Sequence, residues 1–358
     1  MIYRPEDVGF PAVGSGMSKK TITINEIARL AGVSKKSVSR VLNDEQGVSD
    51  KTRAHIKHIM QEAGYEPDRR ARALASSRSL LLGLAYNNRN PSYILDLLAG
   101  SQRAANALGY EVVMHQIADE GAAADDVIRF MRRSGCDGLI ITPPLSESAR
   151  LLADLVSEDW PMVRVAGDHA DFAVPQIRYN DRTAALSLTN QLLKDGHREL
   201  AFIGGPAAAG PTKRRLAGIQ DALTLHGLTA DDLTIVYGDF TFESGKQQGL
   251  ALLQGSTRPS AIVCANDEMA AGVYHAAAVC GVAIPAELSV TGFDDSPVAS
   301  HLYPPLTSVR QPVQAMMALA VQMLTGDSKR PPSDRIAQFD AEVVARESTA
   351  VPHPINAD

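Results

Sequence analysis

Hydrophobic positions follow two different rhythms along the chain. Up to residue 66 they recur at the three- and four-residue spacing of short helices, as at Ile24, Ile27 and Ala28. From Leu80 onward, short apolar runs alternate with helical stretches, which is typical of parallel sheets covered by helices. The pattern predicts a small all-α head followed by a large α/β core.

The head begins with two helices joined by a tight turn. Thr23 and Glu26 match a capping box at the start of the first helix, Gly32 ends it, and Ser34 caps the second. The second helix has an apolar face for packing and a polar, basic face for an outside partner. The apolar positions are Val38, Val41 and Leu42, and the basic face carries Lys35, Lys36, Arg40 and Asn43.

Lys35 and Lys36 occupy the first turn of this helix, where the helix dipole disfavours cations by roughly a few tenths of a kcal/mol each. A polyanion facing the helix end would remove this conflict. A basic second helix after a three-residue turn is the helix-turn-helix pattern, in which the second helix enters the DNA major groove. The alternative interpretation is a small helical corner with a solvated basic face.

A third helix is predicted from its cap at Ser49 to Gly64, with Ile56 and Ile59 on its inner face. Residues 68–75 follow it. They are strongly basic and nearly without an apolar stripe, so they should form a poor helix in isolation.

The motifs AGVS, SVSRVLN, VSDKTR and RAR.LA occur in this order, and together they resemble the lactose-repressor (LacI/GalR) family of bacterial transcription regulators. The resemblance continues to the end of the chain. It implies that the second helix reads operator bases and that residues 69–75 form a hinge helix on operator DNA, with Leu74 wedged into the minor groove. The pattern and the resemblance together assign DNA contacts to Thr23, Ser34, Lys35, Lys36, Ser37, Arg40, Asn43, Arg69, Ala71 and Leu74.

Domain boundaries follow from these patterns. We expect a disordered extension at 1–20, a helix-turn-helix domain at 21–66, a hinge helix and linker at 67–79, an effector-binding and dimerisation core at 80–350, and a tail at 351–358. Within the core, we expect an N-lobe at about 80–179 plus 309–338 and a C-lobe at about 180–308 plus 339–350. Met17 is an alternative start to Met1. The tail lacks the leucine-heptad spacing that joins dimers in some family members, so we expect a homodimer.

The core should contain two doubly wound parallel sheets. Buried strands are predicted at Leu80–Ala85, Glu111–His115, Gly138–Thr142, Met162–Ala166, Leu200–Ile203, Thr234–Tyr237, Ala261–Ala265 and Leu288–Gly292. Helices are predicted at Ser92–Leu108, Arg182–Lys194, Arg214–His226, Ser244–Gln254 and Asp267–Val279. Eight strands are many for one sheet, which favours two lobes with a break near Tyr179-Asn180. The resemblance likewise implies a periplasmic-binding-protein-like core whose chain crosses between lobes three times.

Charge is distributed unevenly. The whole chain has a net charge of −6, yet residues 17–79 carry 13 Lys/Arg against 7 Asp/Glu. A basic head on an acidic body suits a DNA reader whose body stays off the DNA. There is no apolar run of 18 residues and no signal peptide, so we expect a cytoplasmic protein without a membrane partner.

Enzymatic chemistry is not indicated. Gly245-Lys246 resembles part of a P-loop, but Gln247 replaces the needed Ser/Thr. The sequence has no GxSxG and no HExxH. The three cysteines, Cys136, Cys264 and Cys280, lack a CxxC spacing and are interpreted as reduced core thiols. We therefore expect no catalytic residue, no metal and no cofactor.

Polar residues gather where the predicted strands end, and open α/β sheets bind ligands beyond these carboxyl ends. Carboxylates, amides and a guanidinium suit hydroxyl groups, and an aromatic ring suits the C–H side of a sugar. The expected effector-binding residues are Asn87, Ser146, Arg215, Phe240, Asn266 and Asp294. The resemblance implies effector contacts for Arg215, Asn266 and Asp294. It implies a stacking ring for Phe240, whereas Ser146 stands where the sugar-binding prototype has an aspartate.

Structural interpretations stand beside these assignments. Asn266 or Asp294 could be a helix cap, and Arg215 could belong to a surface ion pair. For the Gly204-Gly205-Pro206 segment, turn formation is a full explanation.

The sequence therefore predicts a homodimeric repressor of a pseudo-palindromic operator, controlled by a small-molecule effector, with a saccharide acting as inducer. One alternative is a co-repressor mechanism, in which the ligand favours the DNA-bound state. An alternative from another class is a cytoplasmic sugar-binding protein without a DNA role, against which the basic segment 17–79 argues.

Overall fold

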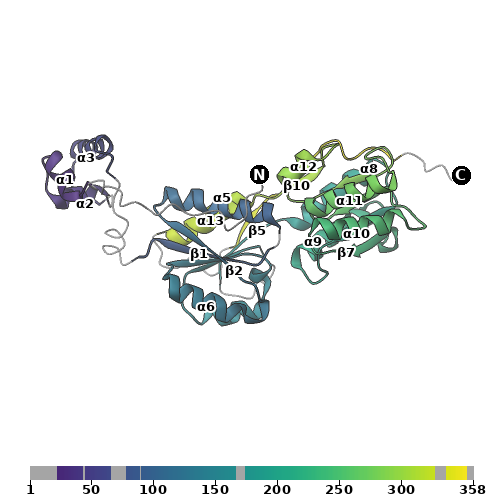
Figure 1. Cartoon of the computed structure of the whole chain (residues 1–358), viewed down its shortest axis with the longest axis horizontal. Helices are drawn as coiled ribbons and strands as arrows, with labels where there is room; N and C mark the ends of the chain where they lie inside the picture. The colour runs from purple at the N-terminus through teal and green to yellow at the C-terminus, as the bar shows by residue number, and fades with distance from the viewer. Residues whose placement is uncertain are drawn as a thin grey trace, which may run out of the picture. The chain divides into compact units, whose positions relative to one another are not determined.

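The chain forms two compact units, Met1–Arg78 and Ser79–Asp358 (Figure 1). The computed structural model describes residues 22–42, 45–65, 78–88, 90–166, 174–326 and 336–352. Several sequence predictions lie outside these ranges. They are the extension at 1–20, most of the hinge, and the DNA contacts predicted for Asn43, Arg69, Ala71 and Leu74.

The first unit contains the three predicted helices. They are α1 (Ile24–Leu30), α2 (Lys35–Leu42) and α3 (Asp50–Glu62). The predicted capping box is confirmed, because the Thr23 side chain accepts from the Glu26 N–H and the Glu26 carboxylate accepts from the Thr23 N–H. Ile27, Val38 and Ile56, one from each helix, are fully buried against one another. This shared core fixes α2 with its basic face turned away from α1 and α3.

The N-lobe of the second unit is built on a six-stranded parallel sheet with the order β11-β5-β4-β3-β1-β2. Its strands are β1 (Leu81–Tyr86), β2 (Glu111–Gln116), β3 (Gly138–Ile141), β4 (Met162–Val165), β5 (Gln176–Tyr179) and β11 (Ile336–Phe339). Successive side chains of a strand point to opposite faces. Accordingly, Leu82 and Leu84 join one hydrophobic cluster and Ala85 joins another.

Helices cover both faces of this sheet. One face carries α5 (Pro91–Ala107) and α13 (Val313–Thr325), and the other carries α6 (Ala123–Ser134) and α7 (Ala149–Val156) (Figure 1). A short 3-10 turn, η3 (Leu145–Glu147), follows β3. The loops after β1 and β3 therefore leave the sheet at the same edge, as the parallel order requires.

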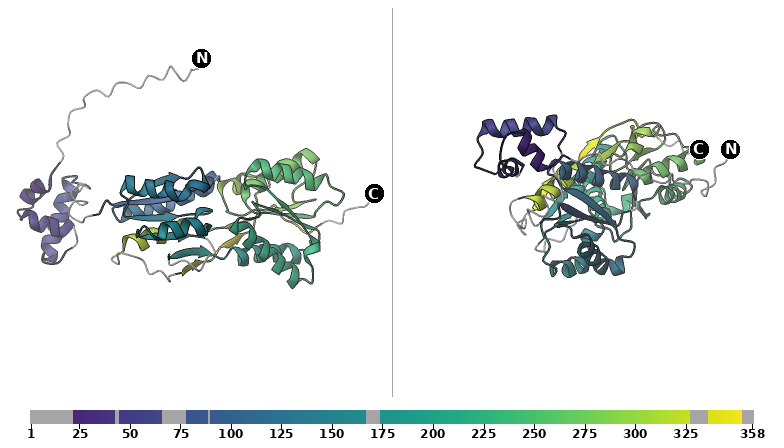
Figure 2. Two further views of the ribbon diagram at one scale, coloured as in Figure 1. Left: turned by 90° about the horizontal axis from the view of Figure 1, so that it is seen from below. Right: turned by 60° about the vertical axis from the view of Figure 1, so that its left-hand side comes forward.

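The C-lobe has a four-stranded parallel sheet with the order β7-β6-β8-β9 (Figure 2). Its strands are β6 (Leu200–Gly204), β7 (Leu233–Tyr237), β8 (Ala261–Cys264) and β9 (Ser289–Thr291). The helices are α8 (Asp181–Lys194), α9 (Gly210–Leu225), α10 (Phe242–Leu253), α11 (Asp267–Cys280) and the short α12 (Pro297–His301). An all-α head followed by two parallel-sheet lobes confirms the predicted fold class.

The chain passes between the lobes at three places. It leaves the N-lobe between β5 and α8, returns through β10 (Ser308–Arg310) to α13, and leaves again between β11 and β12 (Glu342–Val344). β10 and β12 pair antiparallel, so two of the three crossings are hydrogen-bonded to each other.

Candidate functional site

The basic face of α2 is open in the first unit. Lys35 and Lys36 are exposed, and the first turn of α2 contains no acidic residue. The Ser34 Oγ accepts from the Ser37 N–H at 3.1 Å, so Ser34 caps α2 as predicted. These residues therefore present donors and cations at the helix end that the sequence predicts to meet DNA. Thr23, also predicted to contact DNA, is exposed at the cap of α1.

Arg40 is half-buried on the same helix, and its guanidinium lies against the backbone of Gly47. A Cβ added at Gly47 would lie 3.2 Å from Arg40 Nη1, and Gly47 has a φ of +96°. Because Gly47 has no side chain, the Arg40 guanidinium can lie against the backbone of the α2–α3 loop. The loop and α2 together limit the directions in which Arg40 can reach.

In the second unit, the Asp294 carboxylate joins the two lobes. It accepts from Asn90 Nδ2 at 2.8 Å and from Gln311 Nε2. Asn90 caps α5 of the N-lobe, and Gln311 lies in the crossing segment after β10. Asp294 has a φ of +117°, which is unusual for a residue with a side chain. Its backbone N–H donates to Val309 O at 2.8 Å, and this bond holds the strained conformation.

The carboxyl group of Asp294 is enclosed although part of the residue remains accessible to solvent. Burial raises the pKa of Asp294 well above its usual value, and the nearby charge of Asp267 acts in the same direction. Arg215 opposes both effects. A carboxylate whose charge is disfavoured by burial is a strong acceptor for ligand hydroxyl groups, because each hydroxyl offsets part of the burial cost.

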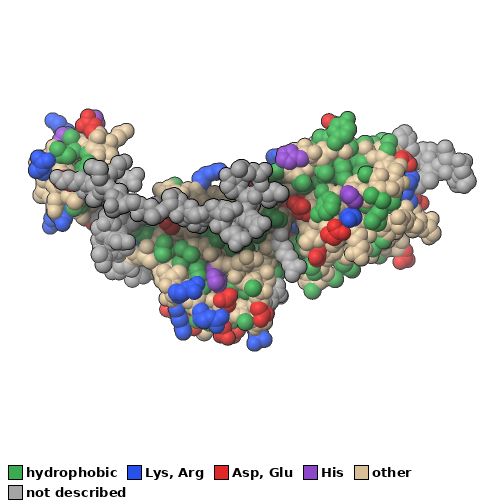
Figure 3. All heavy atoms as spheres, viewed as in Figure 1, with side chains coloured by type: hydrophobic (Ala, Val, Ile, Leu, Met, Phe, Trp, Pro, Cys, Tyr) green, Lys and Arg blue, Asp and Glu red, His purple; other side chains and the backbone are tan. Residues whose placement is uncertain are grey.

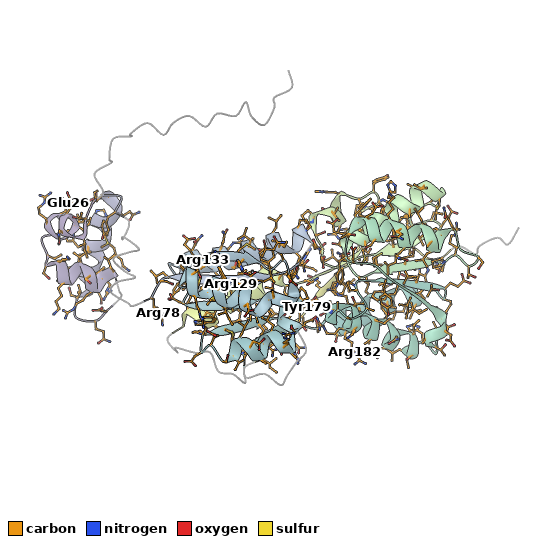
Figure 4. All side chains as sticks on the ribbon, turned by 60° about the horizontal axis from the view of Figure 1, so that its bottom comes forward. Glu26, Arg78, Arg129, Arg133, Tyr179 and Arg182 are labelled. Carbon is orange, nitrogen blue, oxygen red and sulfur yellow. The ribbon has the colours of Figure 1, made fainter. Side chains whose placement is uncertain are left out.

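Arg215 is buried rather than part of a surface ion pair. Its Nε donates to Asp181 Oδ1 at 3.0 Å, and its Nη2 donates to Tyr179 Oη at 2.9 Å. Its guanidinium lies over the ring of Phe293, 3.7 Å from the centroid. Figure 4 labels Tyr179 where the two lobes meet. Arg215 is thus fixed in place. Through Tyr179 it contacts β5, the N-lobe strand after which the chain first passes to the C-lobe.

Asn266 is a helix cap, as the structural interpretation allows, and it also contacts Phe240, another predicted effector residue. Its Oδ1 accepts from the Met269 N–H at 3.0 Å and so caps α11, while its Nδ2 donates to the Phe240 carbonyl at 2.9 Å. Phe240 has a φ of +67°, and its ring lies directly over Gly205. A side chain at position 205 would collide with the ring. The turn-only interpretation of Gly205 was therefore incomplete, because the absent side chain also makes room for Phe240.

The other two predicted residues follow strands of the N-lobe. Asn87 is half-buried directly after β1. Ser146 is fully buried in η3, and its hydroxyl has no hydrogen-bond partner among the residues that the structure describes. Ser146 is therefore enclosed by protein at the N-lobe edge that follows β3.

Sequence reasoning missed Asn90, Gln311, Tyr93 and Asp181. Tyr93 lies in the first turn of α5, where burial and then the charges of Asp294 and Asp181 raise its pKa. One signal was present in the sequence: Asn90-Pro91 is a helix start that closely follows a predicted strand end.

A cavity of about 280 Å³ adjoins Asp294 on the side of α5 and α13. Its lining residues are Asp96, Asp294, Asp295, Arg310, Gln311, Pro312, Gln314 and Ala315.

Within the described ranges, no helix is both long and apolar enough to cross a membrane. The same residues contain no group of three or more side chains able to hold a metal ion. The three cysteines are free, and Cys136 and Cys264 are buried.

Comparisons with known proteins agree on one family. Residues 23–68 match the family described as bacterial regulatory proteins, lacI family, and residues 189–349 match the periplasmic binding protein-like domain. The ribose operon repressor of Escherichia coli (strain K12) is 30% identical over 305 residues, covering 84% of this chain and 92% of the relative. The HTH-type transcriptional regulator AscG of the same strain is 29% identical over 336 residues, covering 92% and 99%.

Solved structures give the same result. A lac repressor dimer bound to operator and the anti-inducer ONPF has a TM-score of 0.71 and 28% identity, covering 92% of this chain and all (100%) of that one. The transcriptional regulator CelR in complex with cellobiose has a TM-score of 0.68 and 27% identity, covering 91% and 99%. The family consists of transcription regulators rather than enzymes. This chain belongs to the lacI family of DNA-binding transcription regulators, with a helix-turn-helix head and a periplasmic-binding-protein-like effector domain.

Proposed function

We propose that this regulator is a homodimeric repressor that leaves its operator when a saccharide inducer binds between the lobes of the core. The observation that carries the proposal is the Asp294 carboxylate, which accepts from Asn90 of the N-lobe and from Gln311 of a crossing segment. Hydroxyl groups of a ligand can compete for the same carboxylate oxygens. Ligand binding would then change how the two lobes are joined.

The chemistry around Asp294 favours a saccharide. A buried carboxylate accepts from adjacent hydroxyl groups, and the partly exposed ring of Phe240 offers an apolar face. The relatives support this ligand class, since one is named a ribose operon repressor and another was solved with cellobiose. Asn87, Ser146, Arg215 and Asn266 complete the proposed effector site.

For the head, we propose that α2 reads operator bases. Lys36 and Arg40 lie on its open face, and Arg or Lys donors to guanine are the commonest base-specific contacts. Ser34, Lys35 and Ser37 at the start of α2, and Thr23 at the cap of α1, suit phosphate contacts. An operator partner implies a cytoplasmic location.

A homodimer is supported by apolar side chains on the C-lobe. Phe242 is 39% exposed, Val279 61% and Tyr303 92%. Phe242 also packs edge-on against His275 of α11. In Figure 3, hydrophobic side chains lie over the α10 and α11 side of the C-lobe. Exposed apolar surface of this kind is typical of protein interfaces, and two copies would present two heads to a pseudo-palindromic operator.

The test combines two measurements on the full-length protein. A thermal-shift screen of mono- and disaccharides identifies ligands, because binding to the folded state raises the melting temperature. Fluorescence anisotropy with the gene's own upstream DNA then measures operator affinity with and without each ligand. We expect a saccharide that raises the melting temperature to weaken operator binding.

The same anisotropy data decide between the alternatives. A ligand that tightens operator binding would identify a co-repressor mechanism, since effector and operator are coupled reciprocally. Saccharide binding without any specific DNA binding would identify a sugar-binding protein without a DNA role.

A further inference from the structure

A second contact between the lobes involves Glu147, the last residue of η3 in the N-lobe. Glu147 Oε2 accepts from the Gly210 N–H at 3.0 Å, and Oε1 accepts from Arg214 Nη1 at 3.1 Å. Gly210 and Arg214 both belong to the start of α9 in the C-lobe. The Glu147 carboxylate of the N-lobe thus binds the N-terminal turn of α9 in the C-lobe.

The N-terminus of α9 is built to receive this carboxylate. The preceding residue, Ala209, makes no side-chain cap, so the first N–H groups of this sixteen-residue helix depend on another acceptor. The positive end of the helix dipole also favours an anion there. A Cβ at Gly210 would collide with the Glu147 carboxylate, so glycine at this position permits the approach.

The cations around this contact are balanced by the protein's own carboxylates. Arg214 Nε donates to Asp181 Oδ2 at 2.9 Å, and the other oxygen of Asp181 accepts from Arg215 Nε at 3.0 Å. The four side chains, Glu147, Asp181, Arg214 and Arg215, are between 1% and 15% exposed. Two guanidinium groups and a helix end, which together would attract an anionic ligand, are therefore already neutralised.

We propose that Glu147 determines ligand specificity: its carboxylate fills the anion position at the start of α9 and restricts the effector to uncharged molecules. A phosphorylated sugar would have to displace Glu147 from two hydrogen bonds, and it would also face Asp181 and Asp294. A neutral saccharide meets no such penalty. This inference rests on the proposed function, because it names the charge class of the saccharide effector.

The direct test asks whether removing Glu147 creates an anion site. The full-length protein, Glu147→Ala and Glu147→Gln are titrated with inorganic phosphate by isothermal calorimetry at matched ionic strength. We expect Glu147→Ala to bind phosphate at least about tenfold more tightly than the wild type, because charged hydrogen bonds from Arg214 and the helix start become free. Adding Arg214→Gln to Glu147→Ala should abolish the gain.

Glu158→Gln is the matched control. Glu158 also pairs with an arginine, Arg132, at 3.0 Å, but both belong to the N-lobe. This control should behave as the wild type does. If Glu147→Ala fails to fold, Glu147→Gln tests the charge alone: it should also bind phosphate more tightly than the wild type, but by less than Glu147→Ala, because the amide still fills the position. Equal phosphate affinity in the wild type and the folded Glu147 variants would overturn the proposal.

A second comparison separates this proposal from the proposed function. Ribose and ribose 5-phosphate, or another sugar and its phosphate from the thermal-shift screen, are titrated into the wild type. Tighter binding of the phosphate form would overturn the role of Glu147 and leave a sugar-responsive repressor intact. Gain of phosphate binding in Glu147→Ala, with no saccharide binding to the wild type, would support Glu147 as the excluder of anions and refute the saccharide effector.

Discussion

Replacing Asp294 by asparagine tests the proposed effector site most directly. The substitution keeps the shape of the side chain but removes its charge and one acceptor. In the free protein this carboxylate accepts from Asn90 and Gln311, and in a complex it would accept from ligand hydroxyl groups. Hydrogen bonds to charged groups contribute about 1.5–3 kcal/mol each. Loss of one such bond should weaken effector affinity roughly 10- to 150-fold.

Folding should tolerate Asp294→Asn well. Burial raises the pKa of Asp294, so between its unfolded and folded pKa values the folded chain binds more protons than the unfolded chain. The free energy of unfolding therefore falls as the pH rises through that window. Removing the ionisable group removes this loss. The lost acceptor leaves one of the two amide donors, Asn90 or Gln311, without its carboxylate partner, which opposes this gain. The variant should therefore stay close to the wild type in melting temperature at neutral pH.

Calorimetry with the effector and anisotropy with operator DNA give the decisive readouts. Asp294→Asn should dimerise and bind operator as the wild type does, yet respond poorly to the effector. The control is Asp221→Asn, which removes a carboxylate from a pair with the exposed Arg182 on the same lobe. Unchanged effector affinity in Asp294→Asn would remove Asp294 from the site and refute the reasoning.

Three further predictions concern the head, the hinge and the core. Arg40→Ala should cost about 1–3 kcal/mol on operator and much less on random DNA. Equal losses in a filter-binding titration of both DNAs would make Arg40 a phosphate contact. Leu74, outside the described residues, should kink operator DNA; Leu74→Ala should bend it less in a circular-permutation gel, and wild-type bending would contradict the hinge assignment. Burial raises the pKa of Asp267 to about 6, so between about pH 4 and 6 the free energy of unfolding should fall with rising pH, by at most about 1.4 kcal/mol per unit. Urea unfolding should show a weaker fall in Asp267→Asn; an identical pH dependence would refute this.

Strong local patterns account for most of the fold that the sequence predicted. All eight predicted strands are present, and so are the five predicted helices of the core. These strands are continuous apolar runs because both faces of their sheets are covered. β5, Gln176–Tyr179, was missed because Gln176 and Arg178 interrupt its apolar pattern. β10 and β12 have three residues each, too few for a periodic signal.

The sequence could indicate only those parts of the candidate site that depend on one lobe. Arg215, Asn266 and Asp294 follow C-lobe strands or lie in the helices after them, so the strand-end rule and the family resemblance both indicated them as candidates. The bond from Asn90 to Asp294 spans 204 positions, and the bond from Glu147 to Arg214 spans 67. Such contacts depend on how the two lobes meet, which no local pattern records.

The two contacts between the lobes differ in what a neutral ligand can do to them. At Asp294, a hydroxyl group can replace the Asn90 amide at little cost, because each donates one hydrogen bond to the same carboxylate. At Glu147, a hydroxyl group would have to separate a carboxylate from a guanidinium that are 14% and 15% exposed, which leaves two poorly hydrated charges. A neutral effector can therefore shift the lobes through Asp294 while the Glu147 contact stays closed. For this reason Asp294→Asn should alter the response to the effector, whereas Glu147→Ala should alter which ligand charges the site accepts.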